Sequence, residues 1–369
     1  MKKLSIIPVL ILAFVLLQCQ SKKEPELLLH VPSPEWEDQV IYFLMIDRFN
    51  DGDQTNNNQN GGEFDQKDFR KFSGGDLQGI IDQLDYIQSL GATAIWITPP
   101  VANQWWDPIN NFSGYHGYWA ENFKEVDKHF GTLELYQQLS HEIHKRGMYL
   151  IQDIVLNHTG NYFQYNGGYD KDSVELFYED NKLSTPTTKP TQYPFNLNNP
   201  NNPEEKNANI YNWTPDILNY EDPFQKYNYQ MAGLDDINTK NIKVREVLRD
   251  SYGYWVEVVG VDGFRIDTII YVELDFWADF MNSLSTEAPG INQVAKNTGR
   301  ANFLTFGETF IKSDPLLNKG DIEVASYMGS KEKPALNSML NYPLYYTINR
   351  VFSQGLPTKF MEYRLNTFV

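Results

Sequence analysis

The sequence predicts an α/β protein built on a parallel β-sheet. Residues 40–46 and 93–98 are short apolar runs of the kind that form buried strands. Residues 77–90, which lie between them, place apolar side chains at helical spacing and end at Gly91, a residue that commonly terminates helices. Because a strand, a helix and a strand at this spacing form one βα repeat, the two strands are expected to run parallel.

The remainder of the chain continues this alternation with one interruption. Residues 159–235 are rich in Asn, Tyr, Pro and Gly and have little periodicity, so we expect a long excursion from the sheet there rather than a connection. The other expected elements are helices over 133–146, 242–259, 274–284 and 335–352, the last interrupted at Pro343, and strands over 148–155, 261–267, 302–307, 323–328 and 367–369.

Composition restricts the classes of partner. The chain has 369 residues, 41% of them hydrophobic and 14% aromatic, and a formal net charge of −17. That length is ample for a large core. Such an acidic protein repels nucleic acid and anionic membrane surfaces, so no nucleic-acid partner is expected. The charge neither favours nor excludes a neutral ligand such as a sugar.

The first residues have the pattern of an export signal. Two lysines precede an apolar run over 4–17 that is too short to span a bilayer, so residues 1–18 are predicted to be a signal peptide. Cys19, the only cysteine, follows directly, and this arrangement resembles a bacterial lipoprotein signal in which the cysteine is lipidated. Gln18 departs from that pattern, and ordinary export with an incidental cysteine is the alternative.

These features predict an exported protein, periplasmic or at the cell surface of a bacterium, whose only membrane contact is a lipid on Cys19. Residues 19–39 are polar and contain proline, as a tether does. One cysteine can form no disulfide within the chain, so the cohesion of the fold must come from core packing, to which bound metal ions could add.

A candidate catalytic pair ends the strand expected over 261–267. Side chains alternate along a strand, so Arg265 and Asp267 point to the same side. A neighbouring cation favours the ionised carboxylate and lowers its pKa, as a nucleophile or a metal ligand requires. Taken alone, such a pair is more often a simple strand-end ion pair, and the other motifs of the chain favour the catalytic interpretation.

Two loops at strand ends also carry candidate binding residues. The stretch 50–58 is dense in oxygen ligands around a turn glycine, which fits either a solvated loop or a calcium loop, because calcium takes six to eight oxygen ligands. The loop with Trp105, Trp106 and the Gly-rich run 114–119 clusters aromatic side chains. After the end of a strand, such a cluster favours a stacking platform for flat ligand faces over a core contact.

Five segments together resemble glycoside hydrolase family 13, the α-amylase family. They are 153–158, 263–267, Gly307-Glu308, 114–119 and 234–238, and they occur in the family's order along residues 40–369. The resemblance implies a (β/α)8 TIM barrel with its site at the carboxyl-terminal face. The barrel would be incomplete at the C-terminus (strands 1 to about 7) and would consist of residues 40–158 and 236–369, with a B domain over 159–235 inserted after strand 3.

The resemblance also implies retaining cleavage of α-1,4-glucosidic bonds in starch-like glucans. That reaction uses two carboxyl groups about 5–5.5 Å apart. Asp267, paired with Arg265, suits the ionised nucleophile, and Glu308, on a largely apolar strand with no adjacent cation, suits the acid/base. Asp153 would hold Arg265 in place.

The family's binding residues carry over to further positions. Tyr118 and His116 would line the sugar ring, and His158 would hydrogen-bond its hydroxyls. The expected cofactor is Ca2+, bound by Asn157 and Asp236 with the carbonyl of Tyr271, where it would clamp the B domain to the barrel. A second calcium site resembling that of cyclodextrin glucanotransferases would use Asp51, Asp53, Asn56, Asn57, Gly74 and Asp76.

Two departures from the family pattern bear on activity. Many members carry Lys-His three and four residues after the nucleophile, whereas this chain has Ile270 and Tyr271. The family's Asn-His-Asp motif, which supplies a third carboxylate, is not reached before Val369, so a fragment with little or no activity is expected. A cyclodextrin glucanotransferase-like transglycosylase and a non-catalytic glucan-binding protein are the alternatives.

Overall fold

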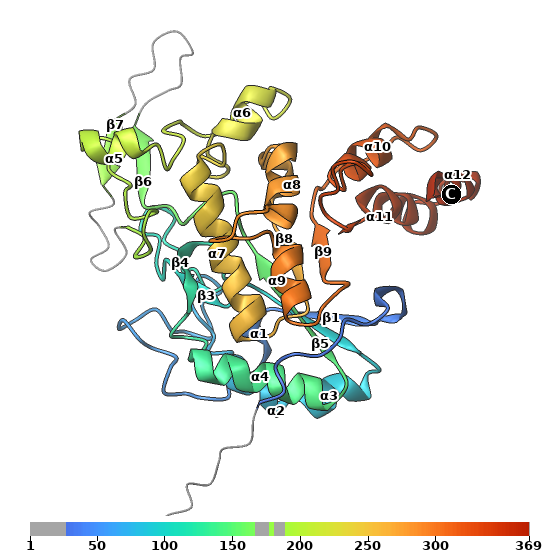
Figure 1. The fold of residues 1–369 in the computed structure, drawn as a ribbon, viewed down its shortest axis with the longest axis horizontal. Helices are drawn as coiled ribbons and strands as arrows, with labels where there is room; N and C mark the ends of the chain where they lie inside the picture. Colours follow the sequence, from blue (N-terminus) through green and yellow to red (C-terminus); the bar gives the residue numbers. More distant parts are fainter. Residues whose placement is uncertain (1–26, 167–176, 181–188, 369) are drawn as a thin grey trace, which may run out of the picture.

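The computed structural model describes residues 27–166, 177–180 and 189–368 (Figure 1). The predicted signal peptide over 1–18 and Cys19 lie outside these described residues. Among the helices of the described residues, none is long and apolar enough to cross a membrane.

A six-stranded sheet in which every neighbouring pair is parallel forms the centre of the protein. Its order is β1 (Ile41–Leu44), β2 (Ala94–Ile97), β5 (Tyr149–Ile154), β8 (Gly263–Ile266), β9 (Leu304–Gly307) and β10 (Ser338–Met339). Because β1 and β10 are the two edges and do not pair with each other, the sheet is open. The prediction of an incomplete (β/α)8 barrel is confirmed.

The helices that follow the strands bury their apolar faces in one continuous core. In α4 (Leu133–Lys145), for example, the side chain of Thr132 caps the first turn by accepting from the backbone N–H of Leu135 at 3.2 Å. Its buried face includes Tyr136, Leu139 and Ile143. The remaining helices of this layer are α1 (Ile46–Phe49), α2 (Leu77–Asp82), α3 (Leu84–Ser89), α7 (Ile242–Val258), α8 (Leu274–Asn282) and α9 (Ile291–Asn297).

Elements outside the main sheet cluster beside its carboxyl-terminal end (Figure 1). An antiparallel pair, β3 (Val101–Asn103) and β4 (Ala120–Val126), comes from the loop after β2. The excursion over 159–235 contributes a second antiparallel pair and two short helices, none of which joins the main sheet: β6 (Phe163–Asn166), β7 (Phe177–Asp180), α5 (Pro203–Ala208) and α6 (Pro223–Asn228).

The expected elements after residue 320 were largely wrong. Residues 323–328 were predicted as a strand, but they belong mostly to α10 (Lys319–Ser326), and the sixth strand is β10. The helix predicted over 335–352 begins only with α11 (Tyr342–Ile348), because Asn341 caps it and Pro343 fits its first turn instead of interrupting it. Short apolar runs do not distinguish strand from helix, which explains these errors. The last described elements are η3 (Asn349–Ser353), α12 (Lys359–Leu365) and η4 (Asn366–Phe368), so residues 366–368 form a helical turn and not a strand.

Residues 27–39, which were predicted to be part of a tether, are instead bound to the barrel. Arg300 donates to the carbonyl of Leu29 at 2.6 Å, and the indole of Trp36 donates to the carbonyl of Asn302 at 2.8 Å. The fit is close, because a Cβ at Gly260 would lie 1.8 Å from the Leu29 oxygen. This segment therefore forms an ordered arm across the amino-terminal end of the strands.

Candidate active site

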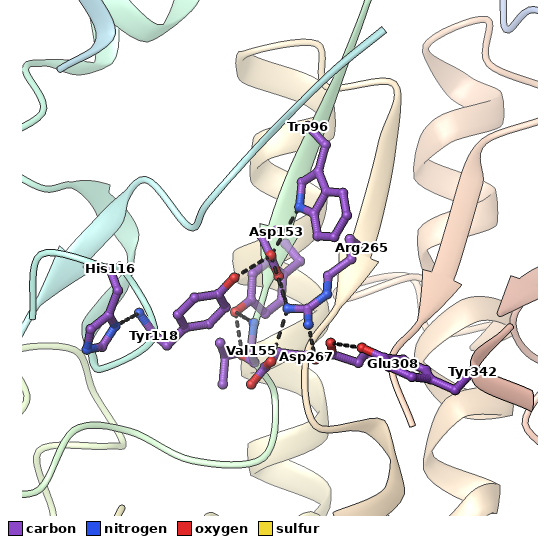
Figure 2. A network of polar contacts seen from close by, with 10 residues as sticks. Trp96, His116, Tyr118, Asp153, Val155, Arg265, Asp267, Glu308 and Tyr342 are labelled. Carbon is purple, nitrogen blue, oxygen red and sulfur yellow. Dashed lines mark hydrogen bonds and ion pairs between the residues drawn. The ribbon is translucent and has the colours of Figure 1, made fainter. Parts of the chain in front are cut away.

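Three carboxylates converge at the carboxyl-terminal ends of three neighbouring strands (Figure 2). Asp153 lies near the end of β5, in register with Arg265 of β8. Asp267 directly follows β8, and Glu308 directly follows β9. Backbone hydrogen bonds continue the ladders to both catalytic candidates, since the N–H of Asp267 donates to Ile154 at 2.9 Å and that of Glu308 to Ile266 at 3.0 Å. The sheet itself therefore positions the carboxylates.

Arg265 lies at the centre of this cluster. Its Nη1 donates to both oxygens of Asp153, at 2.8 and 3.0 Å, and to Oδ1 of Asp267 at 3.0 Å. Its Nη2 donates to Oε2 of Glu308. The expected contact between Asp153 and Arg265 is present, but the expectation that Glu308 has no cation beside it was wrong, because the neighbouring strand supplies one. One guanidinium thus holds the carboxyl groups of Asp267 and Glu308 side by side.

Burial controls the protonation of the cluster. Asp153 is fully buried, which raises its pKa to about 7 although Arg265 opposes this shift. Burial also raises the pKa of Asp267 more than Arg265 and Thr268 lower it. The depressed pKa expected for Asp267 was therefore wrong, because one arginine is shared among three carboxylates and cannot offset the desolvation of each.

The two histidines predicted to face the sugar are neutral. Burial lowers the pKa of His116 to about 3 and that of His158 to about 4. Nδ1 of His116 accepts from the backbone N–H of Tyr118 at 3.0 Å, which leaves its Nε2 as a donor. Nε2 of His158 is buried, and it has no hydrogen-bond partner within the part of the chain that the structure describes. Both rings can therefore offer a nitrogen to a polar ligand without carrying charge.

Tyr118 joins these histidines to the carboxylates. Its hydroxyl donates to Oδ2 of Asp153 at 2.8 Å, and its ring stacks with that of His116 at 5.7 Å between centroids. Sequence analysis missed a second donor to the same oxygen, the indole of Trp96 at 3.1 Å. It also missed Tyr342, whose hydroxyl donates to Oε1 of Glu308 at 2.6 Å. Trp96 could have been found from strand alternation, whereas Tyr342 follows β10, a short strand that was predicted to be part of a helix.

Comparison with known proteins identifies the family to which this chain belongs. A family model described as the catalytic domain of alpha-amylase matches residues 43–343. The chain belongs to the α-amylase family. Among its curated relatives, it is 33% identical over 284 residues to a cyclomaltodextrin glucanotransferase of Klebsiella oxytoca, covering 75% of this chain and 38% of that protein. It is 32% identical to a beta/alpha-amylase of Paenibacillus polymyxa, covering 86% of this chain and 21% of that protein.

Solved structures agree with this assignment. An Anoxybacillus alpha-amylase superposes with a TM-score of 0.63 at 32% identity, covering 87% of this chain and 55% of that one. An alpha-amylase of Geobacillus thermoleovorans, solved with acarbose, has a TM-score of 0.59 at 30% identity, covering 85% and 54%. The chain spans less than half the length of the two curated relatives above. It is thus an amylase-type member of glycoside hydrolase family 13, as the sequence predicted.

Members of the α-amylase family bind calcium, and the loop after β1 has a ligand set that fits this ion. The Oδ1 atoms of Asp51, Asn56 and Asn57 are all buried, and among the described residues none of them has a hydrogen-bond partner. Gly74 packs against Asn57, since a Cβ there would lie 2.8 Å from its amide oxygen. Unpartnered carboxylate and amide oxygens in one loop are the donors that calcium prefers.

The other two residues predicted for this calcium loop have different contacts. Asp53 accepts from its neighbour Thr55 through its side chain, at 2.6 Å. Asp76 caps α2 by accepting from Gly79 at 2.6 Å, and it also accepts from the backbone of Asp53 at 2.8 Å and from Asn56 at 3.1 Å. Asp76 therefore holds the loop closed through hydrogen bonds to its backbone and side chains.

The calcium site predicted at Asn157, Asp236 and Tyr271 is only partly assembled. Asn157 and Asp236 are adjacent, because the carbonyl of Asn157 accepts from Ile237 at 2.9 Å and His158 forms a β-bridge with Asp236. Burial, together with the nearby Glu273, raises the pKa of Asp236 well above its ordinary value, although a hydrogen bond from Asn212 at 2.8 Å and the charge of Lys240 oppose this shift. Among the described residues no hydrogen bond or ion pair joins Tyr271 to either ligand; its ring packs on Tyr220.

Within the described residues, no group of three or more His, Cys, Asp or Glu side chains is arranged to hold a metal ion. Both predicted calcium sites therefore depend on amide and carbonyl oxygens in addition to carboxylates. That donor chemistry is suited to calcium and unsuited to zinc or other metals that prefer nitrogen and sulfur.

Proposed function

We propose that this chain carries the catalytic machinery of an exported retaining hydrolase that cleaves α-1,4-glucosidic bonds in starch-like glucans. The observation that carries the proposal is the pair of carboxyl groups, Asp267 and Glu308, held side by side on neighbouring strands by Arg265. Adjacent carboxyl groups at a cleavage site are the arrangement used for retention of configuration.

In the first half of the proposed reaction, Glu308 gives a proton to the glycosidic oxygen while the bond from C1 to that oxygen breaks. The carboxylate of Asp267 forms a bond to C1 on the opposite face. In the second half, Glu308 takes a proton from water as the water oxygen bonds to C1 and the bond to Asp267 breaks. Each carboxyl group ends the cycle in the state in which it began.

The remaining residues of the site would bind the sugar. Tyr118 presents an aromatic face beside the carboxylates, and neutral His116 and His158 offer ring nitrogens for hydroxyl groups. Arg265 would stay protonated throughout, because the surrounding carboxylates outweigh its burial and raise its pKa. It would hold Asp267 in position while charge develops at C1.

A fluorinated glucosyl substrate that traps the covalent intermediate tests this assignment. The label is expected on Asp267 in peptide maps of the full-length protein, and label on Glu308 or Asp153 would overturn it. The same experiment distinguishes the hydrolase from the non-catalytic alternative, because a glucan-binding protein would bind starch and take up no label.

The cyclodextrin glucanotransferase alternative has support in its own right. Cyclomaltodextrin glucanotransferases, including that of Klebsiella oxytoca, recur among the relatives at 28–33% identity. A transferase passes the glucosyl group from Asp267 to a sugar hydroxyl, while a hydrolase passes it to water. Cyclic products from starch would favour the transferase, and linear products with a matching rise in reducing ends would favour the hydrolase.

Calcium is proposed to bind the loop of Asp51, Asn56 and Asn57, and also Asn157 and Asp236. The ion would supply positive charge to the buried oxygens of the loop, which have no donor among the described residues, and to the buried carboxyl group of Asp236. Because a ligand that binds only the folded state stabilises it by mass action, a chelator should lower the Tm, and added calcium should restore it. Protein purified without chelator and free of calcium by elemental analysis would contradict this proposal.

Two further proposals concern the ends of the chain. Catalysis is proposed to need a third carboxylate contributed beyond Val369, so residues 1–369 alone should show no starch hydrolysis above background, and a chain extended through an Asn-His-Asp motif should be active. Lipidation is proposed at Cys19, and Cys19→Ser should move the protein from membranes to soluble fractions. Strong activity from residues 1–369 would contradict the need for a third carboxylate. A mature N-terminus that is unmodified and lies at a residue other than Cys19 would contradict the lipidation.

A further inference from the structure

Both oxygens of the Glu308 carboxyl group have a donor from a different element. Oε2 accepts from Arg265, and Oε1 accepts from the hydroxyl of Tyr342 at 2.6 Å (Figure 2). The Arg265 contact belongs to the cluster that also holds Asp153 and Asp267. The Tyr342 contact is made to Glu308 alone, so it can act on the acid/base without acting on the nucleophile.

The backbone around Tyr342 is fixed relative to Glu308. β10 pairs with β9 in parallel, with Met339 opposite Gly307, and the N–H of Leu340 donates to the carbonyl of Gly307 at 2.9 Å. Asn341 then caps α11 by accepting from Leu344 at 2.9 Å. The strand pair and the cap therefore place Tyr342 at the end of β10 in the same way that β9 places Glu308.

The ring of Tyr342 is also held by its neighbours. It packs on Phe310 at 5.0 Å between centroids, and on Tyr345 and Tyr346 at 6.3 and 6.1 Å. These rings, with Leu340 and Asn341, line a cavity of about 460 Å³ beside the carboxyl group. Burial and the hydrogen bond to Glu308 raise the pKa of the phenol, so the hydroxyl keeps its proton and remains a donor.

We propose that Tyr342 is a positioning residue for Glu308: its hydroxyl orients the carboxyl group and stabilises the carboxylate that remains after the proton has passed to the leaving sugar. This inference rests on the proposed role of Glu308 as acid/base. A phenol suits the task, because its hydroxyl can donate to a carboxylate and turn to accept from a carboxylic acid, whereas a guanidinium can only donate. Tyr342 can thus keep its contact through both halves of the reaction.

The consequence is a defined pH dependence. A donor to the ionised carboxylate makes the acid lose its proton at lower pH, and its removal has the opposite effect. In the full-length protein, Tyr342→Phe should move the alkaline limb of kcat/KM on a starch oligosaccharide upward by about half to one pH unit. At the optimum pH, kcat should fall about 3- to 10-fold with KM changed less than twofold, because the ring that packs in the site is retained.

Tyr345→Phe is the matched control. Tyr345 contacts the Tyr342 ring, and among the described residues no hydrogen bond joins it to Glu308, so its pH profile should equal that of the wild type. A second substrate, glucosyl fluoride, whose leaving group departs with little need for a proton, should show no shift of the alkaline limb in Tyr342→Phe. A merely structural role would lower the rates on both substrates without moving either limb, and that result would overturn the inference.

Glu308→Gln separates this inference from the proposed function. If Glu308→Gln loses starch hydrolysis and Tyr342→Phe keeps the wild-type pH profile, only the role of Tyr342 is refuted. If Glu308→Gln remains fully active, the acid/base assignment is itself wrong. An upward shift in Tyr342→Phe together with an inactive Glu308→Gln supports both.

Discussion

Both ends of strand β8 carry a cluster of basic and acidic side chains. At the amino end two basic side chains contact one carboxylate, whereas at the carboxyl end one arginine contacts three carboxylates. At the amino end, just before the strand, Asp262 accepts from Arg300 at 2.9 Å, from the backbone N–H of Leu150 at 2.9 Å, and pairs with His144 at 2.8 Å. At the carboxyl end, Arg265 is shared among three carboxylates.

This difference separates a structural cluster from a reactive one. Asp262 is completely buried with both oxygens satisfied, and the arginine that pairs with it also holds the N-terminal arm at Leu29. The carboxyl-end cluster has more negative than positive groups, and burial raises the pKa of Asp153 and of Asp267. Perturbed carboxyl groups are typical of catalytic sites, and barrels place such sites at the carboxyl ends of their strands.

The largest expected effect comes from Asp267→Asn in the full-length protein. Removing a nucleophilic carboxylate should lower kcat by about 10⁴-fold or more. Because the substitution also relieves the excess negative charge, the free energy of unfolding should be unchanged or higher. Steady-state kinetics and denaturant melts on the same samples measure both quantities. A variant that lost stability and kept its activity would show that the carboxyl-end cluster is structural and not reactive.

The matching substitution at the other end, Asp262→Asn, should affect stability and not chemistry. It leaves Arg300 buried without a counter-charge, and breaking such a pair costs about 3–5 kcal/mol. Among molecules that remain folded, kcat should stay within about twofold of the wild type, because Asp262 does not touch the carboxyl-end cluster.

Asp250→Asn provides the control for that substitution. Asp250 pairs with Lys124 at 2.9 Å with its side chain 52% exposed, so its loss should cost less than about 1 kcal/mol. An equal loss of stability in Asp250→Asn and Asp262→Asn would show that burial and pairing do not distinguish the two sites.

The comparison also shows what sequence reasoning could reach. The spacing of Arg265 and Asp267 on a strand correctly placed both side chains on one side, and the βα repeat brought Glu308 to the same end of the sheet. The sign of the Asp267 pKa shift was missed, because it depends on how many carboxylates share the arginine across strands. Tyr342 was missed because its position follows a two-residue strand too short to show periodicity.

The amino-end cluster was missed for a related reason. Nothing local to Asp262 predicts Arg300 or His144 as its partners, since both come from other elements far along the chain. The arm at 27–39 was read as a tether because its polar composition gives no sign that its carbonyls face a buried arginine. Long-range polar contacts of this kind leave no pattern in a single sequence.

A third cluster, around His129, has a charge balance between those of the two ends of β8. Of the substitutions expected to change activity or stability, the one in this cluster should have the smallest effect. His129 pairs with Asp127 at 2.8 Å and with Glu63 at 3.3 Å, and its ring stacks on Phe72 at 3.8 Å between centroids. All three charged side chains are buried. One histidine thus serves two carboxylates. At the amino end of β8 an arginine and a histidine serve the single carboxylate of Asp262, and at the carboxyl end Arg265 serves three carboxylates.

This intermediate balance predicts a pH-dependent stability. Although burial alone would lower it, the two carboxylates raise the pKa of His129 to about 9 from an ordinary value of 6.5. The stabilisation is therefore complete below pH 6.5, falls as the pH rises, and is lost above about pH 9. At 1.36 kcal/mol per pKa unit, this pair of values corresponds to about 3 kcal/mol as an upper limit.

His129→Gln should remove this contribution. The free energy of unfolding of the wild type, measured by denaturant melts between pH 6 and 9.5, should fall more steeply with pH than that of the variant, and the two curves should converge at the alkaline end. His141→Gln, which changes a histidine outside the cluster, should keep the wild-type slope. Parallel curves for the wild type and His129→Gln would mean that His129 is uncharged in the folded protein, and that this cluster is held by neutral hydrogen bonds instead of ion pairs.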